Sequence, residues 1–122
     1  MGICRKCTVV LMACLMLLAG CSRPVQAEDI AGKVYRYEGE GFGGPFTIRL
    51  EEDGTFTYYE GSLSSYIGNG EWSLEGETVT LQEAARHFLF RAEKDRLVFQ
   101  AEGSGQFTYL TIADGEKFLA EE

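Results

Sequence analysis

Four cysteines are the residues of this sequence with the greatest capacity for chemistry, because a thiolate can bind a metal, attack a bond or be modified. They lie at Cys4, Cys7, Cys14 and Cys21, all within the first 21 residues. The spacing Cys4-x-x-Cys7 is typical of metal and redox pairs. What these thiols do therefore depends on the nature of the N-terminal segment.

Residues 1–20 differ in composition from the rest of the chain. Arg5 and Lys6 form a positive start, 8–18 is an apolar run without charge, and small residues precede Cys21. This order predicts a secretory signal peptide. The run is too short for a membrane span, which needs about 20 apolar residues. We expect cleavage before Cys21, which discards the other three cysteines.

The segment Leu18-Ala19-Gly20-Cys21 resembles the lipobox, where bacterial signal peptidase II cleaves before a cysteine that carries diacylglycerol. Ordinary secretion is the alternative. Lipidation would explain the single cysteine left in the mature chain, which has no disulfide partner. The resemblance implies anchoring to the outer face of the cell membrane, or to the outer membrane of a Gram-negative cell. We expect 1–20 to be the signal, 21–29 a lipidated tether and 30–122 one small domain.

The charge of the chain excludes one class of partner. The sequence has 11 basic and 19 acidic residues, for a net charge of −8, and loss of Arg5 and Lys6 makes the mature chain −10. Such a chain repels nucleic acid phosphates. We therefore expect no nucleic acid partner.

The mature sequence contains little that could catalyse a reaction. His87 is the only histidine, so no second imidazole or thiolate completes a transition-metal site with it. The serines cluster in a loop-like segment without the glycine pattern of a nucleophile elbow. We interpret His87 as an outward residue on a strand and expect no catalytic residue.

The acidic residues and glycines also have structural interpretations. Asp53, Asp95 and Asp114 fall at expected turns, where aspartate is favoured, so we interpret them as turn residues and not as calcium ligands. The glycine-rich stretch 39–44 is not followed by a helix, so it lacks the amides that bind a phosphate. We expect neither a metal nor another cofactor.

Alternating apolar and polar residues dominate the mature chain and predict β-strands. The hairpin around Asp53-Gly54 is the clearest element, with Phe46, Ile48 and Leu50 on one face of its first strand. The strands are expected at 33–38, 46–51, 55–60, 71–74, 78–81, 87–93, 97–101 and 106–112.

The segment 82–92 permits two interpretations. Gln82 to Arg86 are good helix formers, whereas Phe88, Phe90 and Ala92 alternate with polar or outward positions. We favour a strand, because packing in an all-β domain overrides local propensity.

Eight short strands joined by tight turns predict an all-β antiparallel meander. It would close into a small lipocalin-like barrel or form a two-sheet sandwich, because either arrangement protects the edges. An eight-stranded barrel holds side chains or one small ligand. The eight Phe, six Tyr and one Trp suggest an interior that is largely filled.

The segment 61–70 offers the best candidate for an interaction surface. It places Leu63, Tyr66 and Ile67 in an expected loop, and Phe42 and Tyr59 could join them. Clustered exposed apolar side chains often mark interfaces. The alternative, which we favour, is that they fold back as a lid over one open end of a barrel.

The stretch 30–118 resembles a family of small, mostly uncharacterised lipoproteins from Gram-positive gut bacteria, whose domain also occurs in extracytoplasmic tails of β-lactam-sensing regulators. The residues that carry the resemblance are Gly-Phe-Gly-Gly (41–44), Phe-Thr-Ile (46–48), Asp-Gly-Thr-Phe-Thr-Tyr-Tyr-Glu (53–60), Ser-Ser-Tyr-Ile-Gly-x-Gly (64–70), Trp72 and Ala-Asp-Gly-Glu-Lys-Phe (113–118). This resemblance implies no particular activity.

The first half also resembles the lipocalin-like barrel of an envelope-stress lipoprotein that senses copper and surface adhesion. The paired cysteines of that protein are absent here, where Gly43-Gly44-Pro45 occupies the corresponding region. The resemblance therefore implies a barrel but not copper or redox sensing.

Three functions remain open for the mature domain. The first is a non-catalytic interaction module that binds an envelope protein or wall component. The second is a lipocalin-like carrier of a small ligand, which requires an unfilled apolar cavity. The third is a hydrolase, which requires His87 in a cleft beside a serine and a carboxylate.

The anchor gives a direct prediction. Replacing Cys21 by Ser should abolish metabolic labelling by fatty acid and release the domain from membranes, because the thiol is the acceptor of the lipid. Cys14→Ser, which alters only the expected signal, should leave labelling intact. Labelling that persists in Cys21→Ser would contradict the lipobox interpretation.

Overall fold

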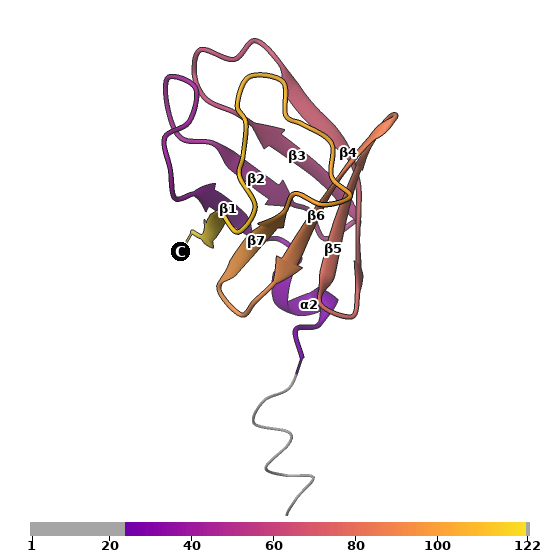
Figure 1. Cartoon of the computed structure of the whole chain (residues 1–122). Coiled ribbons are helices and arrows are strands. Elements are labelled where there is room, and N and C mark those ends of the chain that lie inside the picture. Colours follow the sequence, from indigo (N-terminus) through magenta and orange to yellow (C-terminus); the bar gives the residue numbers. More distant parts are fainter. Residues whose placement is uncertain (1–23, 122) are drawn as a thin grey trace, which may run out of the picture.

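The chain folds into a closed antiparallel β-barrel in which every strand pairs with its neighbours in sequence and the last pairs with the first (Figure 1). The computed structural model describes residues 24–121. Its elements are α2 (Ala27–Ile30), β1 (Val34–Tyr37), β2 (Thr47–Leu50), β3 (Thr55–Tyr59), β4 (Ile67–Glu75), β5 (Thr78–Glu83), β6 (Arg86–Ala92), β7 (Arg96–Gln100) and β8 (Lys117–Ala120). The expectation of an all-β antiparallel meander is confirmed, and closure selects the barrel over the sandwich.

Aromatic rings fill the barrel. Phe88 and Phe107 stack with centroids 4.1 Å apart, and Phe46 meets Phe118 edge-on at 5.1 Å. Aromatic pairs in these geometries add to the stabilisation that comes from burial. The buried rings are Tyr35, Phe46, Phe56, Tyr58, Phe88, Phe90, Phe99, Phe107 and Phe118.

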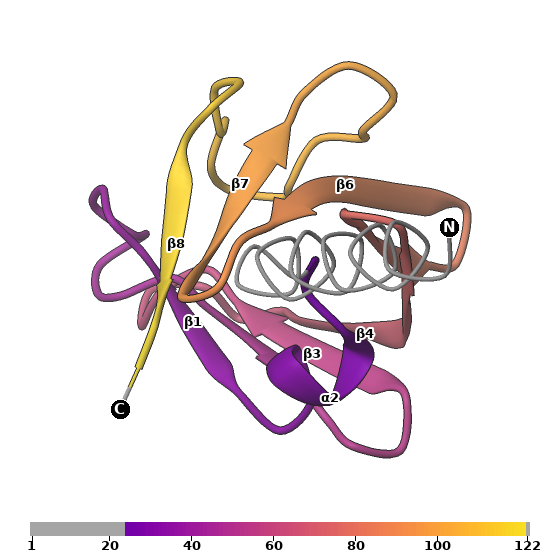
Figure 2. The same cartoon turned by 90° about the horizontal axis from the view of Figure 1, so that it is seen from below.

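The lower end of the barrel in Figure 1 is covered by α2, a one-turn helix, which Figure 2 shows from below. The amide of Gln26 donates to Asp29 Oδ2 at 2.8 Å, which closes the turn. Ile30 at its end is fully buried in the core. The helix thus includes Ala27–Asp29, the last residues of the expected tether. Neither this helix nor any other in the described residues is long and apolar enough to cross a bilayer.

Residues 82–92 form strand and not helix, as we favoured. β5 and β6 pair along six positions, from Thr78↔Arg91 to Glu83↔Arg86. The chain reverses at Ala84, whose φ of 48° is in the left-handed region. The helix formers of this segment are overridden by the pairing of two buried strands.

The expected loop 61–70 is too long, because β4 begins at Ile67 and not at Glu71. The apolar alternation that indicates a strand is missing at its start, because two of the positions are glycine. A Cβ at Gly68 would lie 2.0 Å from Cε1 of the Tyr58 ring, and one at Gly70 would lie 1.9 Å from the Gln82 carbonyl oxygen. The strand therefore uses glycine where a large ring and a neighbouring backbone approach closely.

The expected strand 106–112 is wrong, and the eighth strand is Lys117–Ala120 instead. Residues 101–116 form a long loop at the upper end of the barrel (Figure 1). Its backbone does not need a sheet partner at 108–110, because the carboxylate of Glu60 accepts those three amides. Phe107 and Ile112 are buried, so the loop adds two apolar side chains to the core without forming a strand.

The close approach at Gly68 gives a stability prediction. Gly68→Ala should lower the free energy of unfolding by about 1–3 kcal/mol, since the methyl group displaces the Tyr58 ring. Denaturant unfolding followed by Trp72 fluorescence would measure it. Gly105→Ala is the matched control, because a Cβ there meets its nearest neighbour at an ordinary 3.6 Å. Equal stability of the two variants would contradict this account.

Candidate functional site

The upper end of the barrel carries large apolar side chains that are exposed and not buried in the core. Leu63 is 69% exposed, Ile67 57%, Tyr66 39% and Tyr109 37%. Leu63 and Ile67 therefore do not fold back as the lid that we favoured. The upper part of the interior is filled instead by Phe107, whose ring contacts Phe88 in the core.

The five residues expected to form an interaction surface divide into two groups. Phe42, Leu63 and Tyr66 lie on the loops at the upper end, whereas Tyr59 and Ile67 face each other on neighbouring strands β3 and β4. The Leu63 amide donates to the Phe42 carbonyl oxygen at 3.0 Å, and its side chain covers Gly43.

Tyr109 belongs to the upper group, although we did not expect it there from the sequence. Its ring stacks on Phe42 with centroids 4.9 Å apart, and its hydroxyl lies 3.1 Å from Ser65 Oγ. We call Phe42, Leu63, Tyr66 and Tyr109 the rim patch. Three of the four residues in Phe107-Thr-Tyr-Leu are apolar or aromatic, which could have suggested Tyr109 as a surface candidate. We did not consider it because we assigned this stretch to a strand.

A buried carboxylate fixes the loop that carries Tyr109. Glu60 is fully buried at the end of β3, and its oxygens accept the amides of Thr108 at 3.1 Å and of Tyr109 and Leu110 at 2.9 Å. Hydrogen bonds to a charged acceptor are stronger than neutral ones. The 101–116 loop is thus tied directly to the strand wall.

A second buried carboxylate fixes the loop that carries Tyr66. Glu83, at the end of β5, is buried and accepts the hydroxyls of Tyr58, at 2.8 Å, and Tyr66. Arg86 donates to Glu83 Oε1 at 2.7 Å, to the Tyr58 hydroxyl oxygen at 3.0 Å and to the Gln106 carbonyl oxygen at 2.9 Å. We call Tyr58, Tyr66, Glu83 and Arg86 the rim network.

The electrostatics of the rim network keep its tyrosines protonated. Burial, followed by the hydrogen bond to Glu83, raises the pKa of Tyr58 far above its ordinary value. The bond to Glu83 is also the main cause that raises the pKa of Tyr66. Both hydroxyls therefore remain donors at neutral pH, and through them the network positions the loop.

The residues considered for catalysis and metal binding belong neither to the rim patch nor to the rim network. His87 is exposed on β6, on the outside of the barrel. Asp53 accepts the amide and hydroxyl of Thr55, and Asp114 accepts the Ala101 amide, which are turn contacts. Within residues 24–121, no three His, Cys, Asp or Glu side chains gather in a way that could hold a metal ion. Cys21 lies outside the described residues.

Comparison of the chain with family models, with curated proteins and with solved structures finds no match.

The rim network predicts unequal effects of removing two buried hydroxyls. Tyr58→Phe should lower the free energy of unfolding by about 1–3 kcal/mol, because Glu83 and Arg86 each lose a buried partner. Tyr35→Phe is the matched control. The Tyr35 hydroxyl has no hydrogen-bond partner in the described structure, and its burial raises its pKa to about 12. Its removal should leave stability unchanged or higher, as chemical denaturation can measure.

Proposed function

We propose that the chain is an extracytoplasmic lipoprotein, anchored to the outer face of the cell membrane through Cys21, whose barrel is a non-catalytic binding module for an envelope protein or wall component. Two features of the sequence support this location: the signal-like residues 1–20 and the lipobox-like Leu18-Ala19-Gly20-Cys21. The resemblance to small lipoproteins of Gram-positive bacteria agrees with it.

The rim patch is the observation that carries the binding function. Its side chains leave apolar surface exposed to water, and such surface often marks an interface. Leu63 is the most exposed large apolar side chain of the described residues. The loops beneath are held by Glu60 and Glu83, so the patch has a defined shape before a partner arrives. Such preorganisation lowers the entropic cost of binding.

The position of the patch suits an anchored module. The first described residue, Pro24, leads into α2 at the lower end of the barrel, and the loops 38–46, 60–66 and 101–116 lie toward the upper end (Figure 1). A chain held at Cys21 would therefore direct the rim patch away from its point of attachment. This orientation favours contact with a partner in the envelope space.

The interior of the barrel favours a binding module over the alternatives. The rings of Phe46, Phe56, Phe90 and Phe99 are buried in one core, with Trp72 packed against it, where a carrier would need an open cavity. A hydrolase would need His87 in a cleft, and this residue is exposed.

Capture from cross-linked cell envelopes tests the proposal. The lipidated chain should retain a partner that the Leu63→Ser/Tyr109→Ser variant loses by about tenfold or more, the scale of a hot-spot loss. Leu119→Ser is the matched control, because Leu119 is an exposed apolar residue on β8, outside the rim patch. Equal capture by the rim variant and the control would refute the proposed use of the patch. Release of a small apolar ligand from the purified barrel would favour the carrier.

A further inference from the structure

The connection between the proposed anchor and the barrel is short. The side chain of Val25 packs against the core, and the Gln26 amide donates to Asp29 Oδ2 at 2.8 Å, so the chain is attached to the barrel from Val25 onward. Cys21 precedes Val25 by only four residues. Since an extended chain gains at most about 3.6 Å per residue, the lower end of the barrel stays within about 14 Å of a lipidated Cys21.

The length of the barrel then limits the height of the rim patch. β4 runs from the upper to the lower end of the barrel in nine residues (Figure 1). At about 3.3 Å per residue and a strand tilt of about 40°, the barrel is about 23 Å tall. Even with the connection extended, the rim patch reaches no further than about 40 Å from the bilayer. A lipidated chain can bind only partners that enter this layer.

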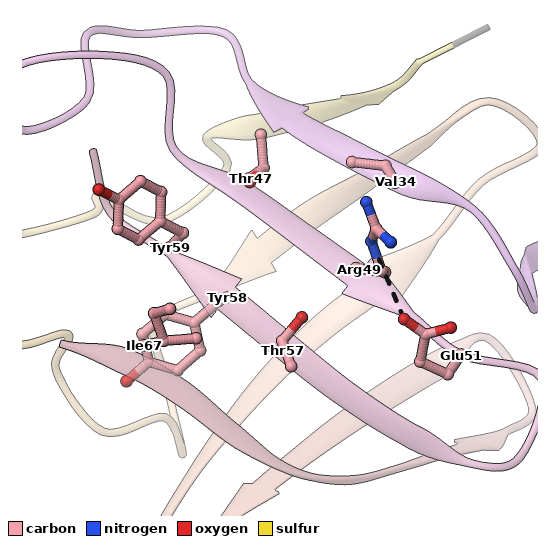
Figure 3. A pocket seen from close by; sticks show the side chains of 8 residues that line it. All are labelled: Val34, Thr47, Arg49, Glu51, Thr57, Tyr58, Tyr59 and Ile67. Carbon is pink, nitrogen blue, oxygen red and sulfur yellow. Dashed lines mark ion pairs between the residues drawn. The ribbon is translucent and has the colours of Figure 1, made fainter. Parts of the chain in front are cut away.

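The exposed apolar surface continues from the rim patch onto one side of the barrel. Ile67, which is 57% exposed, directly follows Tyr66 of the patch and lies beside Tyr59 on the outside of the sheet. Ile67 and Tyr59 lie at one end of a shallow groove of about 270 Å³ on the outer face of β1–β4 (Figure 3). A partner that covers this whole surface must contact the barrel from the side as well as from above.

Neither part of this surface carries net charge. The segments 41–48, 61–70 and 103–113, which bear the rim patch, contain no Asp, Glu, Lys or Arg. The charged side chains of the groove are Arg49 and Glu51, which lie 3.9 Å apart and compensate each other (Figure 3). Complementary charge is what steers a partner to an interface and accelerates its association. This surface offers no such steering, so encounter depends on how concentrated the partner is.

We infer that the occupant of this surface is a protein held in the same membrane, which meets the barrel with an uncharged apolar face. Such a partner rises beside the barrel within the layer that the short connection allows, so it can contact both the rim patch and the groove. Confinement to one membrane raises the effective concentration of the two proteins for each other, as a linker does. The inference rests on the proposed lipoprotein function and specifies its partner.

The height of the rim patch can be measured without a partner. In the mature lipidated chain, Ala113→Cys in the 101–116 loop provides one free thiol for a fluorescent donor, and a dye-labelled lipid in phosphatidylcholine vesicles is the acceptor. Energy transfer should place the donor within about 40 Å of the bilayer. About 30 Gly and Ser residues inserted between Arg23 and Pro24 should reduce the transfer, since such a segment extends by about 30 Å. Equal transfer in both chains would contradict the short connection.

Capture in envelopes from which a muramidase has removed the wall tests the partner. The lipidated chain should be cross-linked to a protein that stays with the membranes, at low and at high salt alike, because no charge pair holds an uncharged interface together. The chain with the Gly and Ser insertion should capture several-fold less of it, since its effective concentration falls. The same segment appended to the C-terminus is the matched control and should leave capture unchanged.

Three results would overturn the inference. Loss of capture on wall digestion would identify a wall component as the occupant. Loss of capture at high salt would show an interface that depends on charge. Equal or greater capture by the chain with the longer connection would show that the partner lies beyond the layer within reach.

A single substitution tests contact from the side. Ile67→Ser should weaken capture by about fivefold or more, the loss expected of a contacting side chain. Leu119→Ser is the matched control, because Leu119 is 37% exposed on β8, outside the groove and the rim patch. Equal capture by the two variants would refute the side contact. Circular dichroism would establish that both remain folded.

The two proposals fail in different ways. If the Leu63→Ser/Tyr109→Ser variant loses capture but the longer connection increases it, the membrane-held partner fails and the rim function stands. If Ile67→Ser and the longer connection both weaken capture but the rim variant does not, the rim function fails and the membrane-held partner stands.

Discussion

The buried carboxylate of Glu60 is the interaction on which the upper end of the barrel depends. Its three backbone hydrogen bonds fix the 101–116 loop, which has no strand of its own. That loop inserts Phe107 into the core and places the Tyr109 ring on Phe42. A buried charge is tolerated only where it is fully hydrogen-bonded, so the carboxylate and the loop each require the other. The exposed rim patch is thus a consequence of a contact hidden beneath it.

The packing of the interior determines where a ligand can be bound. An eight-stranded barrel has room for side chains or for one small ligand, and here the rings occupy it. In the binding module that we propose, recognition is therefore left to the outside of the barrel and to its loops. The closed sheet of the described residues also offers no free edge, so a partner could not bind by adding a strand to it.

The sequence predicted the parts of this fold that depend on local pattern. Strict alternation located β2, β3 and β6, and Asp53-Gly54 located the turn between the first two. The start of β4 was missed because Gly68 and Gly70 interrupt its pattern. Glycine is needed there because a Cβ would overlap the Tyr58 ring or the Gln82 backbone, and both of these are distant in sequence. The false strand at 106–112 has a similar cause, since its amides bond to a side chain about 50 residues earlier. Leu63, Tyr66 and Ile67 were identified from their types, but whether they point inward or outward depends on Phe107, a residue that no local pattern connects to them.

The distribution of charge bears on how an anchored barrel would present these surfaces. Glu52 and Asp53, in the β2–β3 turn, and Glu75 and Glu77, beside the β4–β5 turn, are exposed at the end of the barrel where α2 lies (Figure 1). In the lipoprotein that we propose, this acidic end would face the bilayer. Anionic headgroups would repel it over roughly one screening length, about 8 Å, which favours a domain that stands away from the membrane. Three features of the proposed lipoprotein are then consistent with one another: it is attached at one end, that end has acidic turns, and the rim patch lies at the other end. In that lipoprotein the rim patch would be available to a partner without a conformational change.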